Sequence, residues 1–102
     1  MKLHDIAHSR TGDKGNTANI SLIVYDMKDY PLIERHVTAA RVKRFFGEMV
    51  RGEVARYELP RLGALNFVMK EALGGGVTRT LALDIHGKSF SGALLTMTIP
   101  DA

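Results

Sequence analysis

The run ANISLIVYD at residues 18–26 decides the fold, because its apolar side chains alternate with the period of a β-strand. Successive side chains of a strand point to opposite faces, so Ile20, Leu22 and Val24 share one face. Ile23 makes the other face partly apolar as well. Two apolar faces are typical of a strand inside a sheet, and we expect this run to be a central strand.

The residues that follow predict helices. In TAARVKRFFGEMVRG, residues 38–52, apolar side chains recur every three or four positions, which is the pattern of an amphipathic helix. Thr38 is a favourable N-cap and Gly52 a favourable C-terminal stop. A second helix is expected over residues 62–73 and a shorter helical turn over residues 28–36. The apolar stripe of the first helix consists of Val42, Phe45, Phe46, Met49 and Val50, and that of the second of Leu65, Val68, Met69, Ala72 and Leu73.

Alternating segments elsewhere in the chain predict further strands. They cover residues 2–9, 53–59, 78–85 and 93–99, with a hairpin turn at residues 86–87. Because strands and helices are segregated rather than strictly alternating, the order favours an α+β fold. We therefore predict a single domain, a two-layer sandwich in which two helices cover one face of a mainly antiparallel sheet of four or five strands.

Composition excludes several classes of protein. The 102 residues contain no cysteine, which rules out a disulfide framework, a thiolate zinc site, an iron–sulfur cluster and a cysteine nucleophile. No apolar run is long enough for a membrane span or a signal peptide, so we expect a cytoplasmic protein with no membrane partner.

The charge balance points to an anionic small molecule or an acidic partner. The net charge is +3. Cations gather around the helix at residues 38–52, but acidic residues interrupt them, and a solvated helix face is favoured over a nucleic-acid surface. The cations of this helix region are Arg41, Lys43, Arg44 and Arg51.

The stretch RTGDKGNT, residues 10–17, carries no large apolar side chain and is expected to be a polar loop. Its backbone amides could form an anion-binding nest, with Arg10 and Lys14 supplying charge. Asp13 and Asn16 could equally be turn formers that cap the loop. Acid–base chemistry is a further hypothesis for this region, with His8, Asp13 and Lys14 as the candidate catalytic residues.

A metal site is a minor hypothesis. If residues 2–9 form a strand, His4 and His8 lie on the same face and could bind a metal. No third ligand is evident nearby, so we expect no bound metal and no cofactor. The chain also lacks a nucleotide P-loop, because Ala82 stands where the first glycine of that pattern belongs.

Three runs in register resemble the small ferredoxin-like domain of the acyclic terpene utilization (AtuA) family. They are AHSRTGDKGNTANI at residues 7–20, YELP followed by LGALNF at residues 57–67, and LGGGVTR at residues 73–79. The resemblance covers nearly the whole chain and implies a ferredoxin-like fold. In many relatives this domain is the C-terminal part of a longer protein. Because this sequence starts directly with the small domain, we expect the large domain to be a separate chain or absent.

The resemblance implies a role in catabolism of acyclic terpenoids or branched acyl-CoA compounds. It also favours a binding site or a subunit interface at the two glycine-rich segments, residues 8–19 and 74–79. We expect these segments to converge at one end of the sheet, with Arg10, Lys14 and Arg79 facing an anion such as a CoA phosphate or a carboxylate.

We expect an accessory subunit that works with a separate large AtuA-type chain, and self-association is also expected. The alternative is a free-standing enzyme or a protein that binds a CoA ester or another anion. Asn66, polar in an apolar run, is expected to brace the site by bonding a loop carbonyl. The candidate ligand-binding residues are Arg10, Gly12, Asp13, Lys14, Gly15, Asn16, Asn19, Asn66, Gly75, Gly76 and Arg79.

Overall fold

The central strand predicted from ANISLIVYD is present in the computed structural model, which describes residues 1–14, 17–71 and 89–100. Strand β2 spans Thr17–Val24, and its residues alternate between partly exposed and buried along its whole length. It pairs with β1 (Ala7–Lys14) on one side and with β4 (Ala64–Met69) on the other. β3 (Val54–Leu59) pairs with the far side of β4, so the sheet is antiparallel with the order β1-β2-β4-β3.

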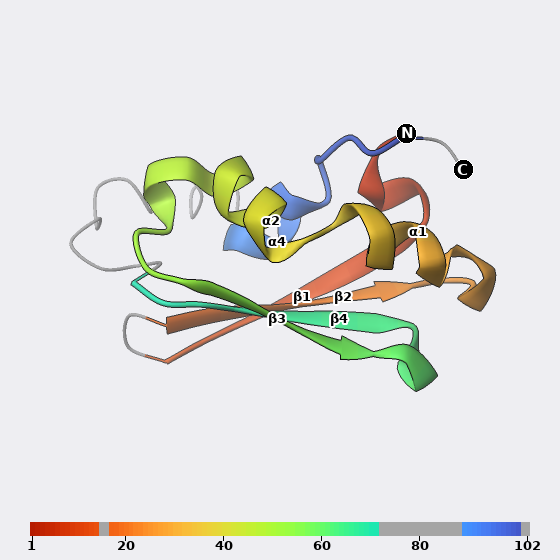
Figure 1. Cartoon of the computed structure of the whole chain (residues 1–102), viewed down its shortest axis with the longest axis horizontal. Helices are drawn as coiled ribbons and strands as arrows, with labels where there is room; N and C mark the ends of the chain where they lie inside the picture. The colour runs from red at the N-terminus through yellow and green to blue at the C-terminus, as the bar shows by residue number, and fades with distance from the viewer. Residues whose placement is uncertain (15–16, 72–88, 101–102) are drawn as a thin grey trace.

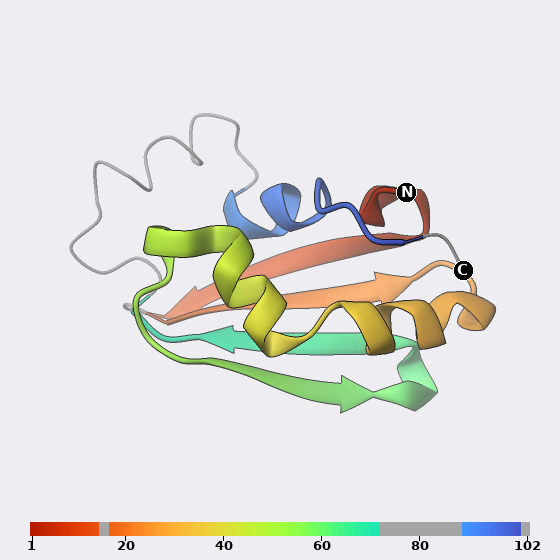
Figure 2. The ribbon, with the colours of Figure 1, turned by 45° about the horizontal axis from the view of Figure 1, so that its top comes forward.

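Three helices cover one face of this sheet, as Figures 1 and 2 show for the part of the chain described above. They are α1 (Tyr30–His36), α2 (Ala39–Phe46) and α4 (Ser89–Leu94). Short 3-10 turns stand between the larger elements: η1 (Leu3–Asp5), η2 (Met27–Asp29), η3 (Gly47–Met49) and η4 (Pro60–Leu62). The predicted two-layer α+β sandwich is thus confirmed, with three helices on the covered face instead of two.

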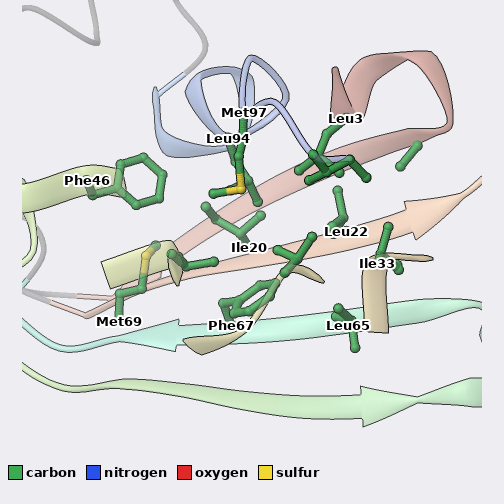
Figure 3. Close-up of a cluster of buried hydrophobic side chains, with 14 of the residues drawn as sticks. Leu3, Ile20, Leu22, Ile33, Phe46, Leu65, Phe67, Met69, Leu94 and Met97 are labelled. Atoms are coloured by element: carbon green, nitrogen blue, oxygen red, sulfur yellow. The ribbon is translucent and has the colours of Figure 1, made fainter. Parts of the chain in front are cut away.

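The core lies between the two layers. Ile20, Phe67 and Leu94 are fully buried there, one from each of β2, β4 and α4. Figure 3 shows the side chains of this cluster lying between the sheet and the helices. Burying a side chain of this size contributes about 1.5–3 kcal/mol, so the inner sheet face supplies much of the stability. The fully buried large side chains are Phe67, Leu3, Ile20, Leu22, Ile33, Leu65, Met69, Leu94, Ile99, Val37 and Val42.

Arg56 ties the edge strand β3 to helix α1. It stands opposite Phe67 on the inner side of the sheet. Its Nη1 donates to the carbonyl oxygens of Glu34 at 2.7 Å and Val37 at 3.0 Å, and its Nη2 donates to Glu58 Oε2 at 2.7 Å. The last carbonyls of a helix lack partners within the helix, so Arg56 satisfies the C-terminal end of α1.

The predicted helix at residues 38–52 forms in its first part. Thr38 is the N-cap, and its Oγ1 accepts a hydrogen bond from the backbone N–H of Arg41 at 3.1 Å. The α-helix ends earlier than predicted, at Phe46, because Gly47 adopts a positive φ of 59° and the chain continues as η3. Gly52, predicted as the stop, instead donates its N–H to the carbonyl of Lys70. The helical turn predicted over residues 28–36 is confirmed as η2 and α1.

Three predicted elements are wrong. Residues 64–69 form strand β4 and not a helix over residues 62–73, because both edges of this segment hydrogen-bond to strands. The strand predicted at residues 93–99 is replaced by the end of α4 and an extended segment with one bridge, Lys2 to Thr98. The strand predicted at residues 2–9 is interrupted, because residues 3–5 form η1 and β1 begins only at Ala7. The strand at residues 53–59 is confirmed as β3, whereas the predictions for residues 78–85 and 86–87 lie outside the described residues.

The two ends of the described chain lie side by side on the helix-covered side of the sheet, as Figure 1 shows. The amino group of Met1 donates to the carbonyl of Ile99 at 2.9 Å, and the N–H of Ile99 donates to the carbonyl of Met1 at 2.8 Å. The N–H of Leu3 continues this pairing to the carbonyl of Met97 at 2.9 Å.

Candidate functional site

The polar loop predicted at residues 10–17 is largely replaced by strands, because residues 10–14 belong to β1 and Thr17 begins β2. Residues 10–14 belong to strand β1, where each stands opposite a residue of β2 from Ser21 to Thr17. The prediction failed because an edge strand with one solvent-exposed face needs few apolar residues. The consequence is that part of the motif lies on a flat sheet surface.

We call the sheet face turned away from the helices the outer face. Strand alternation and the burial of the opposite side chains define it. The register aligns Arg10, Ser21, Asn66 and Tyr57 in one row across all four strands. The structure thus brings the predicted site residues Arg10 and Asn66 to the same surface from different strands.

Asn66 has a different role from the one predicted. It lies in strand β4 and not in a helix, and its Nδ2 donates to Ser21 Oγ at 2.9 Å across the β2–β4 pair. It therefore braces a neighbouring strand and not a loop carbonyl. This bond fixes the amide on the outer face, where Ser21 separates it from Arg10 in the row.

Gly12 and Asn19 form the next row on the outer face. A Cβ atom added to Gly12 would lie 3.1 Å from Asn19 Nδ2 and 3.3 Å from Asn19 Oδ1. The side chain of Asn19 therefore lies against the glycine. A side chain at position 12 would require the Asn19 amide to shift.

His8 and Tyr25 stack on the outer face at the opposite end of β1. Their ring centroids are 5.2 Å apart and the rings are inclined by 25°. His4 does not share this surface, because it lies in η1, where its Nδ1 is 3.3 Å from Asp5 Oδ1. The prediction that His4 and His8 lie on one strand is therefore wrong. Among residues 1–14, 17–71 and 89–100, no cluster of metal-ligating side chains is found.

Sequence reasoning missed a cluster of exposed apolar side chains at the end of the sheet away from the C-terminal end of β1. Tyr57 and Leu59 leave β3 there, 56% and 40% exposed, and Leu62 in η4 is 67% exposed. Tyr25 and Met27 follow β2 and are 68% and 53% exposed. Figure 1 shows η2 and η4 at this same end of the sheet. We call these five residues the apolar end; their only signal in the sequence was the apolar character of the β3 and β4 flanks.

The remaining predicted site residues are only partly placed. Asp13 and Lys14 are the last two residues of β1, opposite Ala18 and Thr17. Gly15, Asn16, Gly75, Gly76 and Arg79 lie outside the described residues. The predicted meeting of the two glycine-rich segments thus stays a prediction.

The four cations predicted around α2 divide between different surroundings. Lys43 Nζ donates to the carbonyls of Val50 at 3.1 Å and Gly52 at 2.5 Å. Arg51 lines an open groove of about 520 Å³ beside Lys43 and Glu53. Arg41 and Arg44 instead line a separate open groove of about 410 Å³.

Comparison of the sequence with known protein families gives a match that covers nearly the whole chain. The family model described as AtuA ferredoxin-like domain matches residues 1–100. The chain belongs to this family. Within the AtuA ferredoxin-like domain described here, residues 7–14 form strand β1 and residues 17–20 begin strand β2, and these two strands carry half of the outer face.

Other comparisons add no relative with an assigned activity. No curated protein matches this AtuA ferredoxin-like domain. No solved structure matches it either. In the described part of the chain, no helix has both the length and the apolar character needed to cross a membrane.

Chemically, the outer face and the apolar end offer polar and apolar groups for contact. Three grooves of the described structure are lined by residues of α2, β3, η4 and the C-terminal segment, and none of the three includes His8 or Arg10. Arg and Tyr beside aliphatic side chains are the residues that protein interfaces favour. The geometry is therefore suited to binding another surface.

Proposed function

We propose that this AtuA ferredoxin-like domain is an accessory subunit that binds a separate, larger AtuA-type chain through its outer face. One observation carries the proposal. Of the six large apolar side chains that are exposed in the described residues, five form the apolar end, which includes Tyr57 of the outer face. Exposed apolar patches of this kind mark interaction sites in soluble proteins.

The size of this surface supports a subunit interface. Four strands spaced about 4.8 Å apart, with about 20 Å of strand length each, give roughly 400 Å² of flat sheet. The side chains of the sheet and the turns η2 and η4 add to that area. A standard interface buries about 800 Å² of accessible surface on each partner, so the outer face and the apolar end together approach what is needed.

The residues on this surface define the chemistry of the partner. Arg10 is exposed and requires a carboxylate or a carbonyl oxygen opposite it. The amide of Asn66 is already engaged with Ser21 and presents a fixed polar centre. Tyr57 and Leu59 require apolar side chains on the partner. A flat surface with one acidic group and an apolar border would complement all of them.

The biological setting of the proposal rests on the family. We propose that the complex acts in the cytoplasm in the catabolism of acyclic terpenoids or related branched acyl-CoA compounds. In this setting the large chain contributes the reacting groups, and the small domain completes or stabilises a shared site.

Co-purification with an AtuA-type large chain from the same genome tests the proposal. Leu59→Lys places a charge in the apolar end, and Phe45→Lys is the matched control, because Phe45 is also 40% exposed but lies on α2. We expect Leu59→Lys to raise the dissociation constant of the complex by about tenfold or more, which is ~1.4 kcal/mol. Phe45→Lys should leave it unchanged.

Several outcomes of this experiment would contradict the proposed subunit contact. Equal binding by both variants, or no complex with the wild-type domain, would overturn the proposal. A complex that contains only copies of this chain would also overturn it, since the outer face would then serve self-association. Circular dichroism of each variant shows that the change in binding does not arise from unfolding.

A further inference from the structure

An open groove on the helix side of the molecule is lined by cations and apolar side chains. It lies between α2 and the C-terminal extended segment, has a volume of about 410 Å³, and is distinct from the outer face. This volume is within the range of sites for small molecules, roughly 300–1,000 Å³. Its lining consists of Arg41, Arg44, Phe45, Thr96, Met97 and Thr98.

The carbonyl oxygens along the groove are already bound by cations. Arg41 Nη2 donates to the carbonyl of Thr98 at 3.3 Å, and Lys2 Nζ donates to the carbonyl of Thr96 at 3.4 Å. A guanidinium group has several N–H donors, so Arg41 is held in position by one bond and keeps others for a ligand. None of the six lining residues is acidic, and two of them are arginines.

Arg44 stands out when it is compared with the other cations of the helix layer. Lys43 is engaged with the carbonyls of Val50 and Gly52. Arg56 is engaged with α1 and Glu58. For Arg44, by contrast, no hydrogen bond or ion pair is found within residues 1–14, 17–71 and 89–100. It lies one helical turn after Arg41 and lines the same groove.

We propose that this groove binds a small organic phosphate. Two guanidinium groups one turn apart can share the oxygens of a dianionic phosphate, and such charge-assisted bonds are strong and directional. The Thr98 hydroxyl adds a donor beside them. Phe45, which is 40% exposed, and Met97 supply an apolar wall for the organic part of the ligand.

The proposed site is independent of the proposed subunit contact. Its residues lie on α2 and the C-terminal segment, whereas the outer face is formed by β1, β2, β3 and β4. A variant that loses the phosphate site is therefore expected to keep binding a partner at the outer face. The two proposals can fail separately.

Titration of the isotope-labelled domain with phenyl phosphate, followed by NMR, tests the proposal. We expect chemical-shift changes at the Arg44 side chain, the Thr98 amide and the Met97 methyl group. Inorganic phosphate should shift the arginine signals alone, and benzoate should bind more weakly because it carries one charge. Sodium chloride at matched ionic strength should produce none of these local changes.

Two variants make the test specific. Arg44→Ala should raise the dissociation constant for phenyl phosphate by about tenfold, and its fold should be intact because Arg44 bonds to no other described residue. Arg35→Ala removes the same charge from an exposed position on α1 and should leave binding unchanged. Shifts that sodium chloride reproduces, shifts away from the groove, or equal affinities of Arg44→Ala and the wild type would each overturn the proposal.

Discussion

Replacing Tyr30 with phenylalanine is expected to stabilise the domain. Tyr30 is the first residue of α1 and is only 7% exposed. Its hydroxyl oxygen is buried, with no hydrogen-bond partner among the described residues. A buried polar group without a partner costs about 1–3 kcal/mol. The phenyl ring of phenylalanine keeps the packing and removes that cost, so we expect a gain of about 1 kcal/mol in the free energy of unfolding.

The same residue predicts a pH dependence. Burial raises the pKa of the Tyr30 phenol above its ordinary value of 10.0, Glu34 and Glu58 raise it further, and Arg56 opposes the rise. The unfolded chain therefore loses this proton at a lower pH than the folded chain does. Linkage then lowers the stability of the wild type as the pH rises from about 10 through the folded-state pKa. Because phenylalanine has no such proton, the advantage of the variant should grow over this range.

Calorimetry of both proteins at pH 7 and at about pH 10.5 measures these effects. In a domain of this size, a change of 1 kcal/mol shifts Tm by roughly 4–8 °C. Tyr57→Phe is the matched control, because Tyr57 is 56% exposed and its hydroxyl group is expected to contribute within about 0.5 kcal/mol. A lower Tm for Tyr30→Phe at pH 7 would refute the reasoning, since it would mean that the hydroxyl group makes a stabilising bond.

Three further substitutions test how the layers are held together. Phe67→Ala removes the largest fully buried side chain of the core and should cost about 3–5 kcal/mol in urea unfolding; a loss below 1 kcal/mol would contradict the packing described. Thr38→Ala removes the N-cap bond of α2 and should cost about 1 kcal/mol, whereas Thr38→Ser should retain most of it. Arg56→Ala removes the contacts of β3 with α1 and Glu58 and should cost about 2 kcal/mol by thermal unfolding, with a change in the helical signal as the second readout.

The central strand and the capped helix could be predicted because their local signals agree with their surroundings. The alternation of Ile20, Leu22 and Val24 predicts a strand with these side chains buried on one face. In β2 all three are buried on the same face. Thr38 and the spacing of Val42 and Phe46 mark a helix start, and α2 begins there. For both segments, the period of the pattern and the tertiary partner favour the same structure.

Strand β4 could not be distinguished from a helix by its pattern. Leu65 and Met69 are four residues apart, which suits a helix, but Leu65, Phe67 and Met69 also alternate, which suits a strand. Pairing on both sides, with β2 and with β3, decides between them, and this information is not local. The strand at residues 10–14 was missed for a related reason, since its strand identity comes from its ladder with β2.

The candidate site was predicted in part for the wrong structural reason. Arg10 and Asn66 were assigned to a loop and a helix, yet both lie on the outer face, in β1 and β4, with Ser21 of β2 between them in the same row. The apolar end was not predicted, because its residues come from segments that are distant in the sequence, such as Tyr25 and Leu62. Only the sheet order brings these segments to one end.

The close pairing of Met1 with Ile99 determines how this domain can be joined to other chains. Met1 and Ile99 exchange two hydrogen bonds on the helix side, away from the outer face. A short linker between the ends should therefore give a circular permutant that still folds, with new termini opened in a surface turn. Such a module can be inserted into a host protein, or fused to one at either end, without blocking the sheet surface. Attachment at the paired ends thus leaves all four strands open to a binding partner.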